Sequence, residues 1–218
     1  VSVVIKKMKI CTVCNKNELR IFEIINCQTY WICNYCDAKL LDKKNYIDHS
    51  DEKKHYLKHN NIINDEGYRN FLSKLIKPLK SYISKNDLGL DYGCGYAPAL
   101  VHILKKDGYK MEFYDPFFFP NKNIFRRKFN FITCTEVVEH FNKPHEEFKK
   151  IDNLLAYNSW FGVMTSFMKE NLNFREWYYR RDPTHVVFYN RKTFQIIAKQ
   201  RNWSIIFPND NIVLFNKR

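Results

Sequence analysis

The 218-residue sequence has no long hydrophobic run and no apolar leader segment. Its longest apolar stretches fall well short of the roughly 20 residues that a membrane span needs, so we expect no transmembrane segment. The first ten residues lack the apolar core of a secretory signal. Without export, the seven cysteines are expected to be free thiols or metal ligands in a cytoplasmic protein, rather than disulfides. The first residue is Val1, so Met8 is an alternative start, and residues 1–7 would then be a poorly ordered tail.

Acidic residues are few compared with basic ones: the sequence has 23 Asp and Glu against 36 Lys and Arg, and its net charge is +13. The excess is +4 in residues 1–60 and +6 in residues 161–218, whereas residues 91–160 carry only +1. Basic ends of this kind could contact an anionic substrate or a nucleic acid. The alternative is a lysine-biased genome, because Asn, Ile and Phe are also abundant. The length suits one large α/β domain with a small module.

Four of the seven cysteines form two Cys-x-x-Cys pairs separated by 18 residues. Between the pairs, residues 21–25 and 29–32 are predicted strands. A module of this size has too little core to fold alone, so a structural zinc ion held by four thiolates is physically reasonable. We therefore predict a zinc ribbon over residues 1–40, with Cys27 outside the metal site. The predicted zinc ligands are Cys11, Cys14, Cys33 and Cys36.

The polar stretch 41–65 is predicted to be a helical linker or lid. His55 and His59 are four residues apart and would share one face of a helix, where they could bind a metal or line the active site. The alternative is a solvated linker helix. Tyr56 lies beside them and could turn inward.

The stretch that follows residue 87 has the pattern of a nucleotide pocket. The apolar run 88–90 ends in Asp91, a turn with Gly93 and Gly95 follows, and an amphipathic helix is predicted over 99–106. Strand, glycine turn and helix form such pockets in open α/β sheets. The glycines allow the backbone to approach a ligand, and the helix start presents N–H groups to it.

A second predicted strand, 110–114, ends in Asp115. A carboxylate at this place can accept both hydroxyl protons of a ribose. The next residues, 116–120, contain three phenylalanines that are expected to pack, either near an adenine or at the sheet edge. Too few residues then remain for a complete strand–helix unit, so we expect a shortened crossover.

The remaining elements complete an α/β pattern. A helix over 66–85, kinked or divided by Pro78, is expected to pack on the sheet. A strand at 130–134 is followed by Thr135–His140 at its carboxyl end, where α/β sites lie. Further elements are a helix from Pro144, a strand at 160–165, a helix at 193–200, and a hairpin of 203–207 with 212–215.

These motifs, in their order, resemble those of class I S-adenosylmethionine (SAM)-dependent methyltransferases. The resemblance is closest to a bacterial group with an N-terminal four-cysteine module, and it covers the predicted methyltransferase domain, 66–218. It implies an α/β fold with a Rossmann-like mixed seven-strand sheet, or a shortened form of it, and helices on both faces. Ala97 departs from the pattern by replacing a third glycine. The resembling segments are Leu90–Gly95, Tyr114–Pro116, Glu136–His140 with Pro144, and His185–Tyr189.

The resemblance implies SAM as cofactor and assigns roles by position. The glycine turn would contact the methionine part of SAM, Asp115 would hold the ribose hydroxyls, and Glu136 would lie beside the sulfonium and the acceptor. Glu139 and His140 would stand just behind these residues. The implied cofactor-binding residues are Asp91, Gly93, Cys94, Gly95, Asp115, Pro116, Thr135 and Glu136.

The implied catalytic residues are His185 and Glu136. Histidine has an unperturbed pKa of about 6.5, which suits proton removal from a hydroxyl or an amine, and Asp182 could orient it. The alternative is a structural His185. The aromatic and basic residues before it could bind a flat or anionic acceptor, or could pack and face solvent. The predicted substrate-binding residues are Trp177, Tyr178, Tyr179, Arg180 and His185.

The function implied is methyl transfer from SAM to a small-molecule acceptor. One alternative is an RNA or protein methyltransferase that uses the ribbon and the basic ends, although no Asn-Pro-Pro-Tyr tetrapeptide follows the fourth strand. A second alternative is a non-catalytic SAM-binding protein, which the intact glycine turn and Asp115 disfavour. A Rossmann dehydrogenase would need Gly-x-Gly-x-x-Gly, whereas position 98 is Pro.

Overall fold

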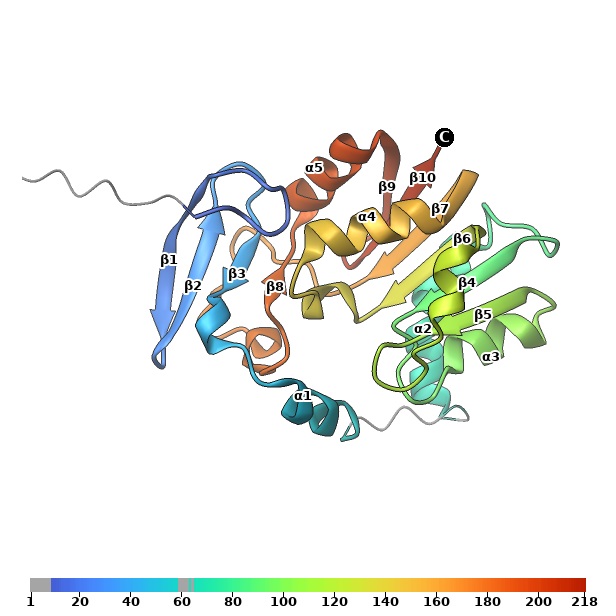
Figure 1. The fold of residues 1–218 in the computed structure, drawn as a ribbon, viewed down its shortest axis with the longest axis horizontal. Coiled ribbons are helices and arrows are strands. Elements are labelled where there is room, and N and C mark those ends of the chain that lie inside the picture. The colour runs from blue at the N-terminus through green and yellow to red at the C-terminus, as the bar shows by residue number, and fades with distance from the viewer. Residues whose placement is uncertain (1–8, 59–62, 64) are drawn as a thin grey trace, which may run out of the picture.

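The structure is a computed structural model that describes residues 9–58, 63 and 65–218. The expectations for the tail 1–7 and for His59 therefore lie outside the described residues. The chain forms a larger sheet and a smaller sheet, which lie side by side (Figure 1). None of the helices in the described part of the chain is long and apolar enough to cross a membrane.

The larger sheet has six strands in the order β5-β4-β6-β7-β10-β9. Strands β5, β4, β6 and β7 are parallel, and β10 is antiparallel to β7 and β9. This is the predicted mixed α/β sheet in its shortened form. The strands are β4 (Leu88–Tyr92), β5 (Lys110–Tyr114), β6 (Phe129–Thr135), β7 (Leu155–Met164), β9 (Trp203–Asn209) and β10 (Ile212–Lys217).

The sheet is shortened at the connection between β5 and β6. That connection holds only the 3₁₀-helix η2 (Lys122–Arg126). A crossover with its own helix needs about 10–12 residues or more, and an added strand needs a further connection, so no extra strand fits here. The expected shortening is confirmed.

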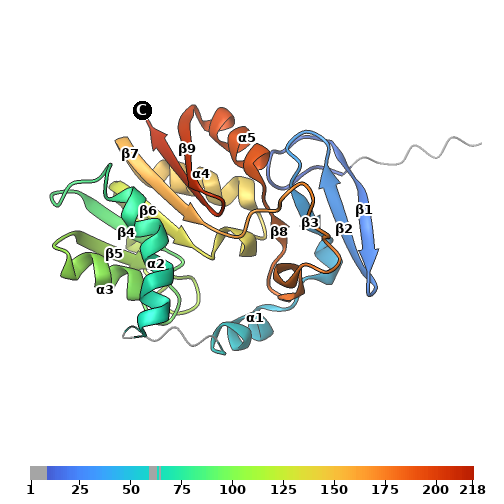
Figure 2. The same ribbon diagram turned by 180° about the vertical axis from the view of Figure 1, so that it is seen from behind.

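Helices cover both faces of the larger sheet and bury two separate cores (Figures 1 and 2). On one face, α2 (Glu66–Leu79) and α3 (Ala99–Lys106) bury apolar stripes at helical spacing. On the other face, α4 (Pro144–Leu154) and α5 (Arg191–Arg201) do the same. The predicted helix 66–85 is shorter than expected, because α2 ends one residue after Pro78, which lacks the N–H that a continuing helix needs.

The smaller sheet is antiparallel in the order β1-β2-β3-β8. Its first three strands come from the predicted ribbon, but the fourth comes from the end of the chain, since Lys39 pairs with Phe188 and Leu40 with Val187. The ribbon is therefore continuous with a late segment of the chain rather than a separate sheet. Its division at residue 40 stays a prediction. The strands are β1 (Leu19–Ile25), β2 (Gln28–Cys33), β3 (Lys39–Leu41) and β8 (Val187–Phe188).

The segment between the two sheets contains η1 (Lys43–Asn45) and the helix α1 (His49–Tyr56). Both views show α1 at the lower edge of the molecule, between the smaller sheet and the larger one (Figures 1 and 2). Asp48 caps the helix by accepting hydrogen bonds from the N–H groups of Ser50 and Asp51. The described part of 41–65 thus contains a helix, and the role of this stretch as a linker or lid stays a prediction.

Candidate active site

A cavity of about 780 Å³ opens at the carboxyl ends of three parallel strands. The last residues of β4, β5 and β6, namely Tyr92, Tyr114 and Thr135, all line it. Ligands of open α/β sheets bind at this edge, and the volume is in the range of small-molecule sites. Seven of the predicted cofactor residues line the cavity: Gly93, Cys94, Gly95, Asp115, Pro116, Thr135 and Glu136.

The turn after β4 needs glycine at its first position. Gly93 has φ of +87°, a conformation that side chains disfavour. A Cβ atom at Gly93 would also lie 2.5 Å from Cγ1 of Val137, which is a steric overlap. The N–H groups of Gly93 and Cys94 donate to the carbonyl of Tyr114 at 2.8 and 3.1 Å, so the turn is fixed against the end of β5.

Asp115 connects the turn after β4 to the loop after β5. Its Oδ2 accepts a hydrogen bond from the Gly95 N–H at 3.0 Å. Its Oδ1 accepts from the N–H groups of Phe117 and Phe118 at 2.8 and 3.0 Å. The buried carboxylate therefore shapes both cavity-lining loops before any ligand binds.

Asp91 lies behind the cavity wall rather than on it. The carboxylate is buried and accepts a hydrogen bond from Thr133 Oγ1 at 2.8 Å. The pKa of Asp91 is raised to about 7. Burial is the main cause, the negative charge of Asp115 adds to the shift, and the hydrogen bond from Thr133 opposes it. In the structure, Asp91 supports the strand end; its predicted contact with a cofactor is not tested.

The walls of the cavity are rich in aromatic rings from three segments. Phe117 stacks on His49 of α1 at 4.4 Å between ring centroids, and Tyr56 packs edge-on to Phe117 at 5.3 Å. Tyr68 and Phe71 of α2 also line the cavity. The inward turn of Tyr56 is as expected, whereas the sequence analysis missed His49, Tyr68 and Phe71. The available signal was that Tyr68 and Phe71 flank the leucine stripe of α2.

Two acids, the partly buried Glu136 and the buried Glu139, lie at the end of the cavity beyond β6. Tyr179 Oη lies 3.0 Å from Glu136 Oε2 and 2.5 Å from Glu139 Oε1. Thr165 Oγ1 donates to Glu139 Oε2 at 2.9 Å. Burial and the neighbouring charge of Glu139 raise the pKa of Glu136 to about 9. Glu136 also has φ of +51°, an unfavourable backbone conformation that aims its side chain at this network.

Two histidines adjoin these acids. The ring centroids of His140 and His185 are 4.8 Å apart, and both residues line the cavity. His185 Nδ1 lies 2.7 Å from the carbonyl oxygen of Tyr179, and burial lowers the pKa of His185. Asp182 also lines the cavity, and its Oδ2 lies 3.1 Å from His55 Nε2 and 4.0 Å from His185 Nε2. The structure thus places Asp182 near His185, as expected, and it also brings His55 to Asp182, a contact that was not expected. His55 itself does not line the cavity.

The structure places the other predicted substrate-binding residues outside the cavity lining. Trp177 is buried against Phe188 of the smaller sheet, with ring centroids 5.8 Å apart. Arg180 donates to the hydroxyl of Tyr30 and to a backbone carbonyl, so its guanidinium supports the ribbon. The expected aromatic cage of Trp177, Tyr178 and Tyr179 therefore does not line this cavity, and acceptor binding by these residues and by Arg180 stays a prediction. Tyr178 is 72% exposed, whereas Tyr179 is buried behind Glu136.

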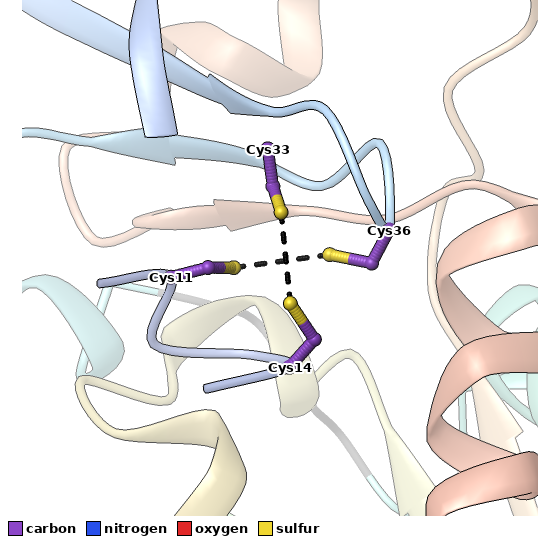
Figure 3. A group of neighbouring side chains, drawn as sticks. All are labelled: Cys11, Cys14, Cys33 and Cys36. Carbon is purple, nitrogen blue, oxygen red and sulfur yellow. Dashed lines mark hydrogen bonds between the residues drawn. The ribbon is translucent and has the colours of Figure 1, made fainter. Parts of the chain in front are cut away.

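The four predicted zinc ligands converge on one point (Figure 3). Their sulfur atoms are 3.8 Å apart for Cys11–Cys36 and 3.6 Å apart for Cys14–Cys33. A tetrahedron of thiolates about 2.3 Å from zinc has edges of about 3.8 Å, so the cluster is compatible with zinc binding. All four cysteines are buried, while Cys27 is exposed and apart from them.

A family model described as a methyltransferase domain matches residues 65–206. The chain belongs to this family. The predicted enzyme class, a SAM-dependent methyltransferase, is thereby confirmed, and the cavity described above is its candidate active site. No curated protein matches the sequence of this methyltransferase.

Solved structures of other methyltransferases are similar to this one at low sequence identity. A SAM-dependent methyltransferase from Archaeoglobus fulgidus has a TM-score of 0.49 at 14% identity, over 68% of this chain and 94% of that one. Magnesium protoporphyrin IX methyltransferase from Synechocystis, with bound SAM, has a TM-score of 0.47 at 10% identity, over 78% and 92%. An O-methyltransferase family protein from Burkholderia thailandensis has 0.48 at 10% identity, over 67% and 56%. At TM-scores below 0.5 these similarities indicate nothing about the substrate.

Proposed function

We propose that this methyltransferase moves the methyl group of SAM to a small-molecule acceptor, at an oxygen, nitrogen or carbon atom, and releases S-adenosylhomocysteine. The observation that carries the proposal is that the residues assigned to the cofactor and those assigned to the acceptor line one cavity. The glycine turn and Asp115 line one part of it, and Glu136 and His185 line another. A cavity of about 780 Å³ is large enough for a cofactor and a small acceptor together.

The residues at the glycine turn fit SAM. Asp115 uses backbone N–H groups to fix its position, and a carboxylate oxygen has lone pairs for further hydroxyl donors. Thr135 Oγ1 is buried without a hydrogen-bond partner among the described residues, so it is available to a ligand. Phe117 and Phe118 supply aromatic faces for an adenine ring.

When bound, SAM supplies the reactive methyl carbon on its sulfonium sulfur. The chain then has to align the acceptor with that carbon, exclude water and assist removal of the acceptor proton. Glu136 and His185 are the polar groups that we assign to the acceptor end. Because burial lowers the pKa of His185, its ring is neutral near pH 7 and can offer a nitrogen lone pair to a proton or to a cation.

Calorimetry with S-adenosylhomocysteine tests this proposal without a known acceptor. We expect binding by the wild-type protein and a ten- to hundredfold weaker affinity in Asp115→Asn, because each hydrogen bond to a charged group contributes about 1.5–3 kcal/mol. Asp210→Asn, at an exposed carboxylate outside the cavity, is the matched control and is expected to bind normally. Absence of heat with the wild-type protein would falsify the proposal.

We also propose that Cys11, Cys14, Cys33 and Cys36 hold one structural zinc ion. The support is their burial and their near-tetrahedral sulfur spacing. With this ion, residues 1–40 form the ribbon, 41–65 the linker, and 66–218 the catalytic domain, as in the bacterial group that the sequence resembles. Unpaired thiols in all described cysteines suit the cytoplasm.

A further inference from the structure

Three side chains at the acceptor end lie close enough to share a cation. Glu139 and His140 end the short helix η3 (Val138–His140), which follows β6, and His185 comes from the segment that precedes β8. Their ligand atoms all lie within 4.8 Å of one another. Neighbouring ligands of a six-coordinate divalent ion are about 3 Å apart, so small side-chain rotations would close the set around an ion.

The charge at this place is negative and buried. Glu139 is 0% exposed, and its hydrogen-bond partners are the hydroxyls of Thr165 and Tyr179. Glu136 shares the Tyr179 hydroxyl. Within the described ranges, neither acid forms an ion pair with a lysine or an arginine. Buried carboxylates are costly unless a cation or a proton compensates them, and a divalent cation between the acids and the histidines would do so.

The two imidazoles are held as metal ligands usually are. His140 Nδ1 lies 3.1 Å from the carbonyl of Thr184, and His185 Nδ1 lies 2.7 Å from the carbonyl of Tyr179. A carbonyl can only accept, so in both rings Nδ1 carries a proton, and in the neutral form of each ring the lone pair is on Nε2. His140 Nε2 lies 4.0 Å from Glu139 Oε1. Backbone carbonyls fix the tautomer and orientation of ligating histidines in the same way in known metal sites.

From this geometry we propose that Glu139, His140 and His185 bind a divalent transition-metal ion at the acceptor end of the cavity. Two imidazoles and a carboxylate suit manganese, iron, cobalt, nickel or zinc better than calcium. The role rests on the proposed function: the ion binds a hydroxyl oxygen of the acceptor and eases loss of its proton to solvent. A bond then forms between that oxygen and the methyl carbon as the carbon–sulfur bond breaks, and S-adenosylhomocysteine leaves with the electron pair. The acceptor class is therefore a hydroxyl compound.

Titration of the zinc-loaded full chain with Mn²⁺, followed by electron paramagnetic resonance, tests the site. We expect one equivalent of Mn²⁺ to bind the wild-type protein. Glu139→Gln, which keeps hydrogen bonds to Thr165 and Tyr179, and His185→Gln should each weaken binding at least tenfold. His102→Gln, on the exposed side of α3, is the control and should not.

Absence of bound Mn²⁺ in the wild-type protein, or equal binding in all variants, would overturn the site. If a variant proves unstable to heat, the Mn²⁺-bound wild-type protein is measured instead, because an ion at this site should broaden the ring resonances of His140 and His185 at lower Mn²⁺ concentration than that of His102. Calorimetry with S-adenosylhomocysteine on the same samples separates the two proposals. Cofactor binding without Mn²⁺ binding rejects only the metal site, and Mn²⁺ binding without cofactor binding rejects the proposed function.

Discussion

At the scale of single residues, two glycines with nearly the same positive φ have different surroundings. Gly93 has φ of +87° and Gly108 has φ of +88°. A Cβ atom would overlap Val137 at Gly93, whereas at Gly108 its nearest neighbour, Lys85 Cδ, is 3.8 Å away. Both positions have a φ that disfavours alanine, and only the first one is in the cavity wall.

Replacing each glycine by alanine separates the effect of backbone strain on stability from the effect of the cavity wall on cofactor binding. Both variants should lose about 1–2 kcal/mol of stability from the left-handed conformation. Only Gly93→Ala should also bind S-adenosylhomocysteine at least tenfold more weakly, because relief of the overlap with Val137 displaces the turn. Thermal unfolding and calorimetry measure the two effects. Equal cofactor affinity in the two variants would contradict the role of the turn.

Asp91 should make stability depend on pH. Its pKa is raised to about 7 in the folded protein, from an ordinary value of about 3.9, so the folded state holds the proton more tightly. The stabilisation is complete below about pH 4 and is lost as the pH rises toward 7, by up to about 4 kcal/mol. We expect the fall in Tm between pH 4 and 7 to be smaller in Asp91→Asn than in the wild type. Glu170→Gln, at an exposed acid, should follow the wild-type curve; a parallel curve for Asp91→Asn would refute the assignment.

At the scale of helices and strands, pattern and spacing were sufficient for most of the fold. The alternation of apolar runs and amphipathic stretches predicted every strand of the larger sheet, and the Cys-x-x-Cys pairs predicted the cysteine cluster. Strand β8, with only two residues, was not predictable, since its existence depends on pairing with β3. Trp177 packs on Phe174 and Tyr179, which are near it in sequence, and on Phe188 of β8.

The contacts at the acceptor end of the cavity were also not predictable from the sequence. Glu136 and His185 were identified from their motifs, but the contacts of Glu136 and Glu139 with Tyr179 depend on how two separate segments meet. His55 and Asp182 are 127 positions apart in sequence, and no local periodicity relates them. Sequence patterns report local periodicity and motif spacing, whereas these contacts depend on tertiary packing.

The cysteine cluster should stabilise β8 as well as the ribbon. Thr193 of α5 donates a hydrogen bond to the carbonyl of Cys36 at 2.8 Å, and β3 pairs with β8. We expect Cys33→Ser to lose stoichiometric zinc, to have a lower Tm and to show faster hydrogen exchange at residues 186–188. Metal analysis and exchange mass spectrometry measure this. Cys27→Ser, at the exposed cysteine, should keep its zinc and wild-type exchange; the same zinc content in both variants would argue against the site.

At the scale of the whole molecule, the chain has a net charge of +13, and some of its basic residues near the smaller sheet form ion pairs. Lys169 and Arg191 both pair with Asp210, and Lys192 pairs with Asp37. These three basic residues therefore contribute less to an open positive surface than unpaired ones would.

We expect any binding to a random RNA oligonucleotide to be purely electrostatic. Its affinity should fall by orders of magnitude between about 50 and 200 mM salt, and labelled SAM should transfer no methyl group to it. Fluorescence anisotropy at graded salt and scintillation counting check both points. Salt-resistant binding with methyl incorporation would favour an RNA methyltransferase instead.

The pairing of β3 with β8 also fixes an order of events during synthesis. The ribbon leaves the ribosome before the catalytic domain, and its thiols can take up metal before that domain is complete. Its sheet, however, stays open along the edge of β3 until Val187 and Phe188 have been made, after most of the catalytic domain. Unpaired strand edges are where nascent chains associate wrongly. Early metal capture would therefore protect the growing chain, and the pairing of β8 with β3 would then close the edge of the ribbon and bring His185 to the cavity.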